Sequence, residues 1–231
     1  MAMTPTWPPR IGLGARLRHA VGRTLLRARS AEEMKELAQL RRRLGQPGTI
    51  LCLGNGPSSE GAGLHTDFDC LFRVNWIWRQ RAFLIEPDLV FTADPDLPPP
   101  GSRAILGFPT AAAADRILRA HLRQDRSPAA WFTVPDLSPE LAAGRWPAYP
   151  TNGALMIGVA AALRPQRLVI AGIDLYQDPE GKYPGASDEP NEYGDLHDRN
   201  TDLDYMRTAL SGYDGELVIL SAALKSSLKT V

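Results

Sequence analysis

The stretch from Thr151 to Ala171 constrains the fold more than any other part of the sequence. Thr151-Asn152-Gly153 opens a small, apolar helical segment that runs to Leu163. Residues 167–171, with Leu168-Val169-Ile170 at the centre, are a near-continuous apolar strand. Strands that are apolar on both faces are typical of parallel sheets, because crossover helices cover both sides of such a sheet. The order of helix and then buried strand therefore predicts an α/β fold.

Other apolar runs and helical patterns extend this prediction along the chain. The predicted strands are 49–53, 68–75, 89–92, 104–108, 131–134 and 216–220, and the predicted helices include 111–124 and about 201–210. A chain of 231 residues can bury one good core. We predict a single Rossmann-like domain at residues 47–231, with a parallel-dominated, twisted sheet flanked by helices, and a helical arm at residues 1–46.

Polar residues follow several of the predicted strands at the point where each strand ends. They are Asn55, Asn75, Asp94 and Asp174. The ligand crevice of a parallel sheet lies at the carboxyl ends of its strands. The sequence therefore predicts that these side chains meet at one shared site.

A glycine-rich turn, Gly54-Asn55-Gly56-Pro57-Ser58-Ser59, follows the strand at 49–53. A strand that leads into such a turn can bring backbone N–H groups to a phosphate or nucleoside. The turn lacks the lysine of a Walker motif and the third glycine of the dinucleotide fingerprint, which excludes both. An ordinary strand-to-helix turn is the alternative interpretation.

The charges divide the chain into a basic arm and an acidic body. The formal net charge is zero, which argues against nucleic acid as the main partner. Residues 1–46 nevertheless carry a net charge of +7, and the remainder carries −7. Residues 11–29 have the pattern of a basic amphipathic helix, and a second helix is predicted from about Met34 to Leu44. The arm either docks on an anionic membrane surface or packs on the body.

The cysteine and apolar patterns bear on location and on metal binding. Cys52 and Cys70 lie in apolar runs, which favours two buried thiols and a reducing compartment. There is no Cys/His cluster, no apolar run long enough to cross a bilayer and no signal-peptide pattern. We expect a cytoplasmic protein, either free or peripheral on the inner face of the membrane.

His197 is the strongest candidate for a catalytic group. It stands among polar residues just before a predicted helix, after a long Gly/Pro-rich segment, 178–196, that is predicted to be a lid. Taken alone, His197 is better interpreted as a helix-capping or loop histidine. His19 and His121 are predicted to lie on solvated helix faces, and His65 in a loop.

Four stretches together resemble the bacterial sialyltransferases of glycosyltransferase family 42. They are Leu53-Gly54-Asn55-Gly56-Pro57-Ser58; Phe68-Asp69 with Phe72-Arg73-Val74-Asn75; the helix from Thr151 to Ala162, leading into Ala171-Gly172-Ile173-Asp174-Leu175-Tyr176-Gln177; and His197 with Asn200-Thr201-Asp202. The resemblance covers roughly residues 49–228. It implies a variant of the GT-A fold that binds CMP-sialic acid without a metal, and a glycan acceptor as the second substrate.

The resemblance also implies roles for particular residues. Asn55 and Asn75 would contact the donor nucleotide and its phosphate, Tyr176 and Tyr183 would stabilise the departing phosphate, and His197 would be the general base. The expected donor-binding residues are Asn55, Gly56, Ser58, Asn75, Asp94, Asn152, Gly153 and Asp174, and no cofactor or metal is expected. Either Asp198 or Asp202 is available to orient the imidazole ring.

Three positions depart from the family pattern on the side of the sugar. Asn152 replaces a serine, Tyr149 replaces an arginine, and Asp94 replaces an asparagine. The expected reaction is therefore inverting transfer of sialic acid, or of a related acidic sugar such as a 3-deoxy-octulosonate, to a glycan hydroxyl. The alternatives are a metal-dependent transferase that uses Asp94 and Asp96, and a non-catalytic nucleotide-binding relative. The sequence leaves open whether the chain works as a monomer or as a homo-oligomer.

Overall fold

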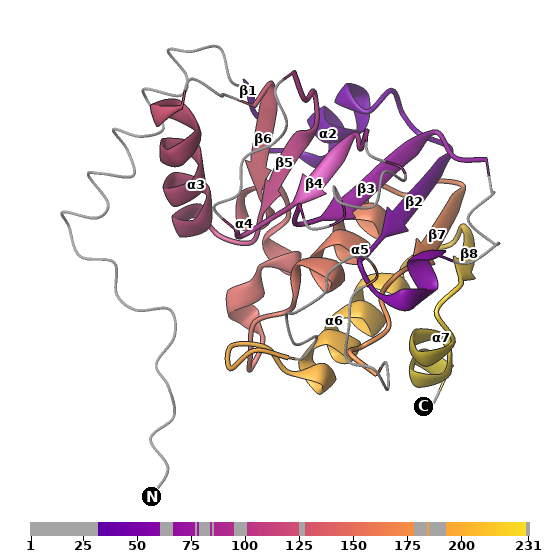
Figure 1. Cartoon of the computed structure of the whole chain (residues 1–231). Coiled ribbons are helices and arrows are strands. Elements are labelled where there is room, and N and C mark those ends of the chain that lie inside the picture. The colour runs from indigo at the N-terminus through magenta and orange to yellow at the C-terminus, as the bar shows by residue number, and fades with distance from the viewer. Residues whose placement is uncertain are drawn as a thin grey trace, which may run out of the picture.

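A computed structural model of the chain shows one parallel sheet with helices packed against it (Figure 1). The structure describes residues 32–60, 67–76, 78, 84, 86–94, 101–124, 128–177, 184 and 193–229. Its strands are β1 (Glu32–Glu33), β2 (Thr49–Leu53), β3 (Cys70–Val74), β4 (Leu89–Phe91), β5 (Ile105–Phe108), β6 (Ala130–Thr133), β7 (Arg167–Ala171) and β8 (Glu216–Ile219). Its α-helices are α2 (Leu37–Arg43), α3 (Ala111–Arg123), α4 (Val134–Leu137), α5 (Asn152–Ala162), α6 (Arg199–Ser211) and α7 (Ala222–Lys229). Short 3-10 helices are η1 (Pro57–Glu60), η4 (Pro139–Leu141) and η5 (Ala143–Arg145).

The strand order places a topological switch point in the middle of the sheet. The order is β1-β6-β5-β4-β3-β2-β7-β8, and every neighbouring pair is parallel. The chain moves outward from β2 through β6 and then returns to lay β7 on the other side of β2. A crevice opens beyond the carboxyl ends of the strands where the direction of winding changes. The predicted parallel α/β fold is therefore confirmed, and the site is expected beyond β2 and β7.

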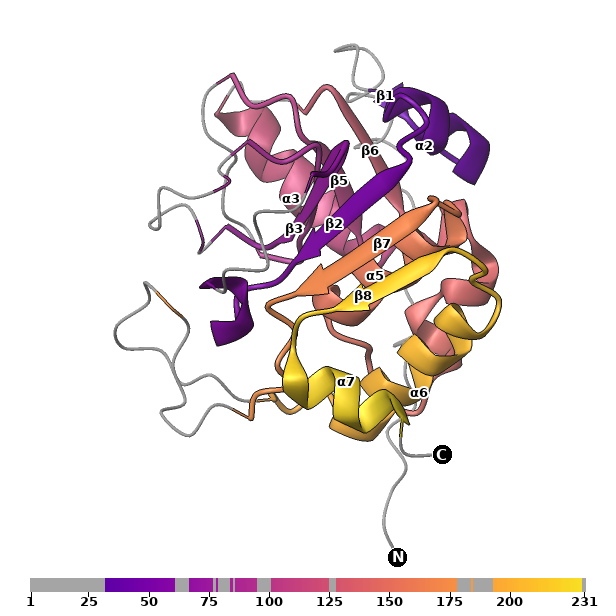
Figure 2. The same ribbon diagram turned by 90° about the vertical axis from the view of Figure 1, so that its right-hand side faces the viewer.

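Alternation along the strands divides the core into two faces, because successive side chains of a strand point to opposite sides. Val90, Leu106 and Trp131 pack with Ile117 and Leu118 of α3 on one face. The apolar residues of α5 pack with Phe72, Phe91 and Phe132 on the other face. Figure 2 shows α3 and α5 on these opposite sides of the sheet. Helix α5 is buried along almost its whole length, which explains why its sequence is so uniformly apolar.

Residues 32–46 belong to the sheet and core, which differs from the predicted boundary at residue 46. Glu32 and Glu33 form β1, which pairs with β6, and α2 begins only at Leu37. Met34 and Leu40 are fully buried in the same core as α5. The predicted helix start near Met34 is therefore wrong, because the backbone of this segment hydrogen-bonds to the edge of the sheet. The predicted helix at 11–29 lies outside the described residues.

His121 is buried, so its predicted place on a solvated face is wrong. Its neighbours Arg119 and Arg123 suggested a polar surface. His121 instead shares a helix face with Ile117 and Leu118, which lie four and three residues before it and are buried against the sheet. His19, His65, Asp96 and Tyr183 lie outside the described residues.

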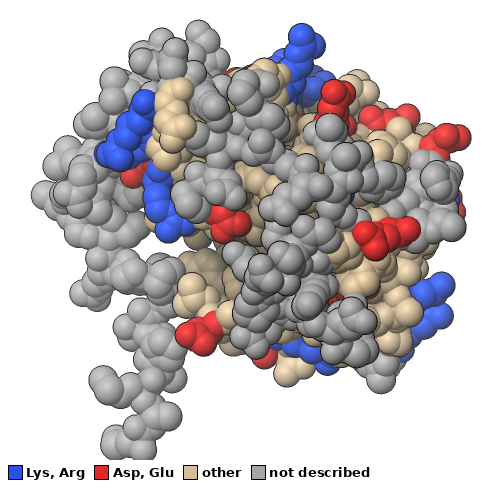
Figure 3. All heavy atoms as spheres, viewed as in Figure 1, with Lys and Arg blue, Asp and Glu red and all other residues tan. Residues whose placement is uncertain are grey.

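Charged side chains are scattered over the described part of the face shown in Figure 3, and neither sign gathers into a single patch there. No described helix is both long enough and apolar enough to span a bilayer. The sheet edge where the strands end is therefore the most informative part of the surface for function.

Candidate active site

A pocket of about 120 Å³ opens beyond the carboxyl ends of β2, β3 and β7. It lies at the switch point between β2 and β7, where α5 and α6 also begin. Its lining residues are Asn55, Gly56, Val74, Asn75, Thr151, Asn152, Gly153, Gly172, Ile173, Asp174, Leu175, Tyr176, Tyr193, His197 and Asp202. Most of the predicted site residues are thus brought together. Ser58 and Asp94 are not in the lining, and Tyr183 is not among the described residues.

The backbone on the floor of the pocket is tightly constrained. A Cβ atom on Gly54 would lie only 2.2 Å from the carbonyl oxygen of Gly172, so the turns after β2 and β7 can cross only because this residue is glycine. Asn75, Leu175 and Tyr176 have φ values of 50°, 53° and 55°. Non-glycine residues seldom adopt this left-handed region, and such residues cluster at functional sites. The folded chain therefore carries local backbone strain where it shapes the pocket.

Asn55 lines the pocket and has one side-chain oxygen without a hydrogen-bond donor among the described residues. The residue is 7% exposed, and its Nδ2 donates to the Val74 carbonyl oxygen at 3.2 Å. Its Oδ1 is buried and has no hydrogen-bond partner among the described residues. A buried acceptor without a donor is costly, so a ligand N–H or O–H placed there would be stabilised.

Asn75 and Asn152 form a side-chain pair across the pocket. The Asn152 Nδ2 donates to the Asn75 Oδ1 at 2.9 Å. This bond leaves the Asn75 amide nitrogen and the second lone pair of its oxygen for other partners. Asn152 is the first residue of α5, so the pair also ties the end of β3 to the start of that helix.

Asp174, which follows β7, is hydrogen-bonded to the turn that follows β2. Its Oδ2 accepts hydrogen bonds from the Ser58 backbone N at 2.9 Å and from the Ser58 Oγ at 3.0 Å. The Ser58 Oγ in turn accepts from the Gly172 N at 2.7 Å. Ser58 therefore acts behind the pocket, where it fixes the side chain of Asp174.

His197 is held by a backbone carbonyl. Its Nδ1 lies 2.8 Å from the Tyr149 carbonyl oxygen, and the Tyr149 N donates to the Leu196 carbonyl at 3.0 Å. A carbonyl can only accept, so Nδ1 must carry the proton. In the neutral ring this leaves Nε2 as a lone pair, which is the form that a general base requires.

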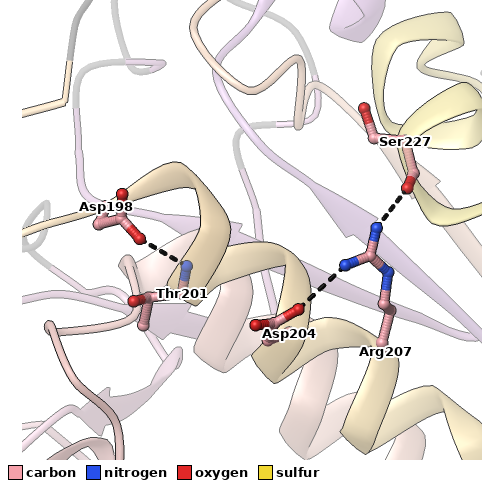
Figure 4. Close-up of polar contacts among 5 residues, drawn as sticks. All are labelled: Asp198, Thr201, Asp204, Arg207 and Ser227. Atoms are coloured by element: carbon pink, nitrogen blue, oxygen red, sulfur yellow. Dashed lines mark hydrogen bonds and ion pairs between the residues drawn. The ribbon is translucent and has the colours of Figure 1, made fainter. Parts of the chain in front are cut away.

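The two aspartates that follow His197 accept their hydrogen bonds from other residues. Asp198 is the N-cap of α6, where its Oδ2 accepts from the Thr201 N at 2.8 Å (Figure 4). Asp202 is 3% exposed and accepts from the backbone N and the Oγ1 of Thr151 at 2.7 and 2.8 Å. Burial raises the pKa of the Asp202 carboxyl, while the bonds from Thr151 and the nearby His197 oppose that rise. The ring of His197 is therefore oriented by Tyr149.

Tyr176 and Tyr193 form an aromatic pair on the lid side of the pocket. Their ring centroids are 4.4 Å apart, and the Tyr193 hydroxyl donates to the Asp202 Oδ2 at 3.3 Å. Burial, followed by the charge of Asp202, raises the pKa of Tyr193. Sequence reasoning missed Tyr193 as a site residue, and the only available signal was its place near the end of the predicted lid.

The residues described here include no group of three or more His, Cys, Asp or Glu side chains placed to hold a metal ion. Within the predicted Asp94-Pro95-Asp96 motif, the Asp94 backbone N bonds to the Thr92 Oγ1 at 3.1 Å. The remainder of that motif lies outside the described residues.

No family model and no curated protein matches the chain. Solved structures of Campylobacter jejuni sialyltransferases resemble it at low identity. The sialyltransferase CstII in complex with cytidine-5'-monophosphate is 19% identical with a TM-score of 0.48, over 76% of this chain and 80% of that one. CstII in complex with CMP-3FNeuAc is 17% identical with a TM-score of 0.45, over 78% and 83% of the two chains. An alpha-2,3-sialyltransferase in apo form is 15% identical with a TM-score of 0.40, over 76% of each chain.

Proposed function

We propose that the chain is an inverting glycosyltransferase that moves sialic acid, or a related acidic sugar, from a CMP-sugar to a glycan hydroxyl without a metal. The observation that carries the proposal is the state of His197. Its Nδ1 is tied to the Tyr149 carbonyl, so that Nε2 is left as a proton acceptor in a pocket at the switch point of the sheet. The motifs that resemble family 42 contribute Asn55, Asn75 and Tyr176 to the same pocket.

The start of α5 is the proposed position of the donor phosphate. The residues that line the pocket include two carboxylates and, among those the structure describes, no Lys or Arg. Asp174 and Asp202 are already engaged by Ser58 and Thr151. The first N–H groups of a helix lack intrahelical partners and carry a partial positive charge. Those of Asn152 and Gly153 therefore offer neutral donors to an anionic phosphate.

The proposed reaction is a direct displacement at the anomeric carbon. As the acceptor oxygen bonds to that carbon, its proton passes to Nε2 of His197. The bond between the anomeric carbon and the phosphate oxygen breaks, and its electron pair leaves with CMP. The Tyr176 hydroxyl, and that of Tyr183 by resemblance, would donate to the phosphate as its charge develops. Attack from the opposite face inverts the anomeric centre.

The test is a thermal-shift series with CMP, CMP-sialic acid, CMP-octulosonate, UDP-sugars and GDP-sugars. A ligand at 100 times its Kd stabilises the folded state by about 2.7 kcal/mol. For a domain of this size that corresponds to a rise in Tm of roughly 5–10 °C. We expect the cytidine ligands to raise the Tm, with and without EDTA. Asn75→Ala should reduce the rise, and Asp195→Ala, which changes an exposed residue outside the pocket, should not.

Each rival function gives a different result. A metal-dependent transferase would lose its CMP-sugar turnover in EDTA. A non-catalytic nucleotide-binding protein would be stabilised by CMP but would release no CMP from any CMP-sugar and acceptor. Stabilisation by UDP-sugars alone would refute the proposed donor.

A further inference from the structure

Asp202 links two walls of the pocket that are far apart in the sequence. It lies in the first turn of α6, and its Oδ1 accepts from the Thr151 backbone N at 2.7 Å. Its Oδ2 accepts from the Thr151 Oγ1 at 2.8 Å and from the Tyr193 hydroxyl at 3.3 Å. Both carboxylate oxygens therefore accept hydrogen bonds. Oδ1 bonds to the backbone at the start of α5, and Oδ2 bonds to the side chains of Thr151 and Tyr193.

The burial of Asp202 and the nature of its hydrogen-bond partners bear on its role. Asp202 is 3% exposed, and the groups that donate hydrogen bonds to it, the N–H and hydroxyl of Thr151 and the hydroxyl of Tyr193, are uncharged. Placing a carboxylate in such a position carries a substantial desolvation cost that hydrogen bonds must offset. A side chain that served only to fill this space would be apolar.

The groups that Asp202 holds are parts of the proposed site. Thr151 is the N-cap of α5, so its position sets that of Asn152, which bonds to Asn75. Tyr193 carries its ring against Tyr176, with centroids 4.4 Å apart. Movement of either group would displace a hydrogen-bond donor of the proposed reaction.

We propose that Asp202 is a positioning residue that fixes the Tyr193–Tyr176 pair and the start of α5 relative to each other. The role in transfer rests on the proposed function, whereas the hold on Tyr193 does not depend on it. Asp202 touches neither substrate nor reacting atom in this role, and it acts through the residues to which it is bonded.

Asp202→Asn is a specific perturbation, because an amide has only one acceptor oxygen. If that oxygen keeps the Thr151 N–H, the amide nitrogen faces the two hydroxyls, which must then accept instead of donating. Tyr193 would change from donor to acceptor with little change in volume. Asp204→Asn is the matched control on the same helix, because the Asp204 side chain is 62% exposed and pairs with Arg207 at 3.0 Å (Figure 4).

The first measurement is NMR of protein labelled with ¹³C at tyrosine Cζ, without any ligand, with Tyr193→Phe to assign the signal. We expect Asp202→Asn to shift the Tyr193 signal and Asp204→Asn to leave it in place. An unmoved Tyr193 signal in Asp202→Asn would overturn the proposal, whether or not the chain transfers sugar.

The second measurement is steady-state transfer, with CMP affinity measured separately by calorimetry. Misplacement by about 1 Å can lower a rate roughly 100-fold. We expect Asp202→Asn to lower kcat by about 10- to 100-fold while the Kd for CMP changes less than about threefold. In the Tyr193→Phe background, the factor by which Asp202→Asn lowers kcat should be at least about threefold smaller, because the hydroxyl of Tyr193 that Asp202 holds has been removed. The positioning role would be refuted if Asp202→Asn left kcat unchanged. It would also be refuted if the double variant lost kcat by the product of the two single losses.

Discussion

The contact between α5 and α6 at Gly158 gives the sharpest test of how packing supports the site. A Cβ atom at Gly158 would lie 2.6 Å from the Tyr205 Oη and 2.8 Å from its Cε1. Tyr205 is fully buried, stacks edge-on against Trp146 at 5.3 Å and bonds to the Leu141 carbonyl at 3.3 Å. These contacts hold the ring in place, so we expect Gly158→Ala to push the two helices apart.

The expected cost combines two opposing effects. Overpacking a core typically costs about 1–3 kcal/mol. Alanine in a helix interior recovers up to about 1 kcal/mol relative to glycine. Because Tyr205 is held on several sides, we expect a net loss of roughly 1–2 kcal/mol, which lowers the Tm by about 2–8 °C. The Thr151–Asp202 bonds join the same two helices, so sugar transfer should fall as well.

Urea unfolding of Gly158→Ala and Gly212→Ala measures this effect. Gly212 is the control, since it ends α6 with φ −99° and a Cβ there would meet nothing within 4 Å. We expect the control to lie within about 0.5 kcal/mol of the wild type. If Gly158→Ala proves as stable as the control, the close contact does not limit the approach of the two helices and the reasoning fails.

Three further predictions follow from buried polar groups and thiols. Burial raises the folded-state pKa of Asp202 above its ordinary value of about 3.9, so the folded state binds this proton more tightly than the unfolded state. The free energy of unfolding of the wild type, measured relative to that of Asp202→Asn, should therefore fall as the pH rises from about 4 towards 7. A difference between the two urea midpoints that stays constant over this range would contradict this. Burial also raises the pKa of Cys52 and Cys70, so a disulfide reagent at pH 8 should label neither thiol before unfolding; rapid labelling of the native protein would refute their burial. Ser58→Ala leaves Asp174 without a hydroxyl donor and should cost about 1–3 kcal/mol in calorimetry, whereas a loss below about 0.3 kcal/mol would show that Asp174 is held by its other contacts.

The sheet was predictable because its strands are short apolar runs that end in polar residues. The ranges 49–53 and 167–171 match β2 and β7 residue for residue. The pairing of β1 was not predictable, since Glu32 and Glu33 contribute backbone bonds to an edge and their side chains show no strand pattern. The prediction that His121 lies on a solvated face was wrong for a related reason. Its charged neighbours lie on other faces of α3, while His121 itself is on the buried face.

Local sequence motifs predicted several residues of the site but not the contacts between distant segments that hold them in place. Asn55, Asn75 and Asp174 follow strand ends, so the rule for parallel sheets places them together, whereas Asp94, which was predicted by the same rule, is not in the pocket lining. The bond between Asp202 and Thr151 joins residues 51 positions apart. Such a tie depends on how α6 packs against α5, which no local pattern records. The carbonyl that orients His197 belongs to Tyr149 and leaves no trace in side-chain identity.

The central claim is that His197 removes the proton from an acceptor hydroxyl while a CMP-sugar is cleaved. The most direct measurement is acceptor-dependent CMP release from CMP-sialic acid and CMP-octulosonate by wild type, His197→Ala and the surface control Asp195→Ala. We predict turnover by the wild type and the control, and a fall of 10²–10⁴-fold in His197→Ala, as is typical for loss of a general base, with CMP affinity retained. A fall of less than about tenfold in His197→Ala would contradict the account.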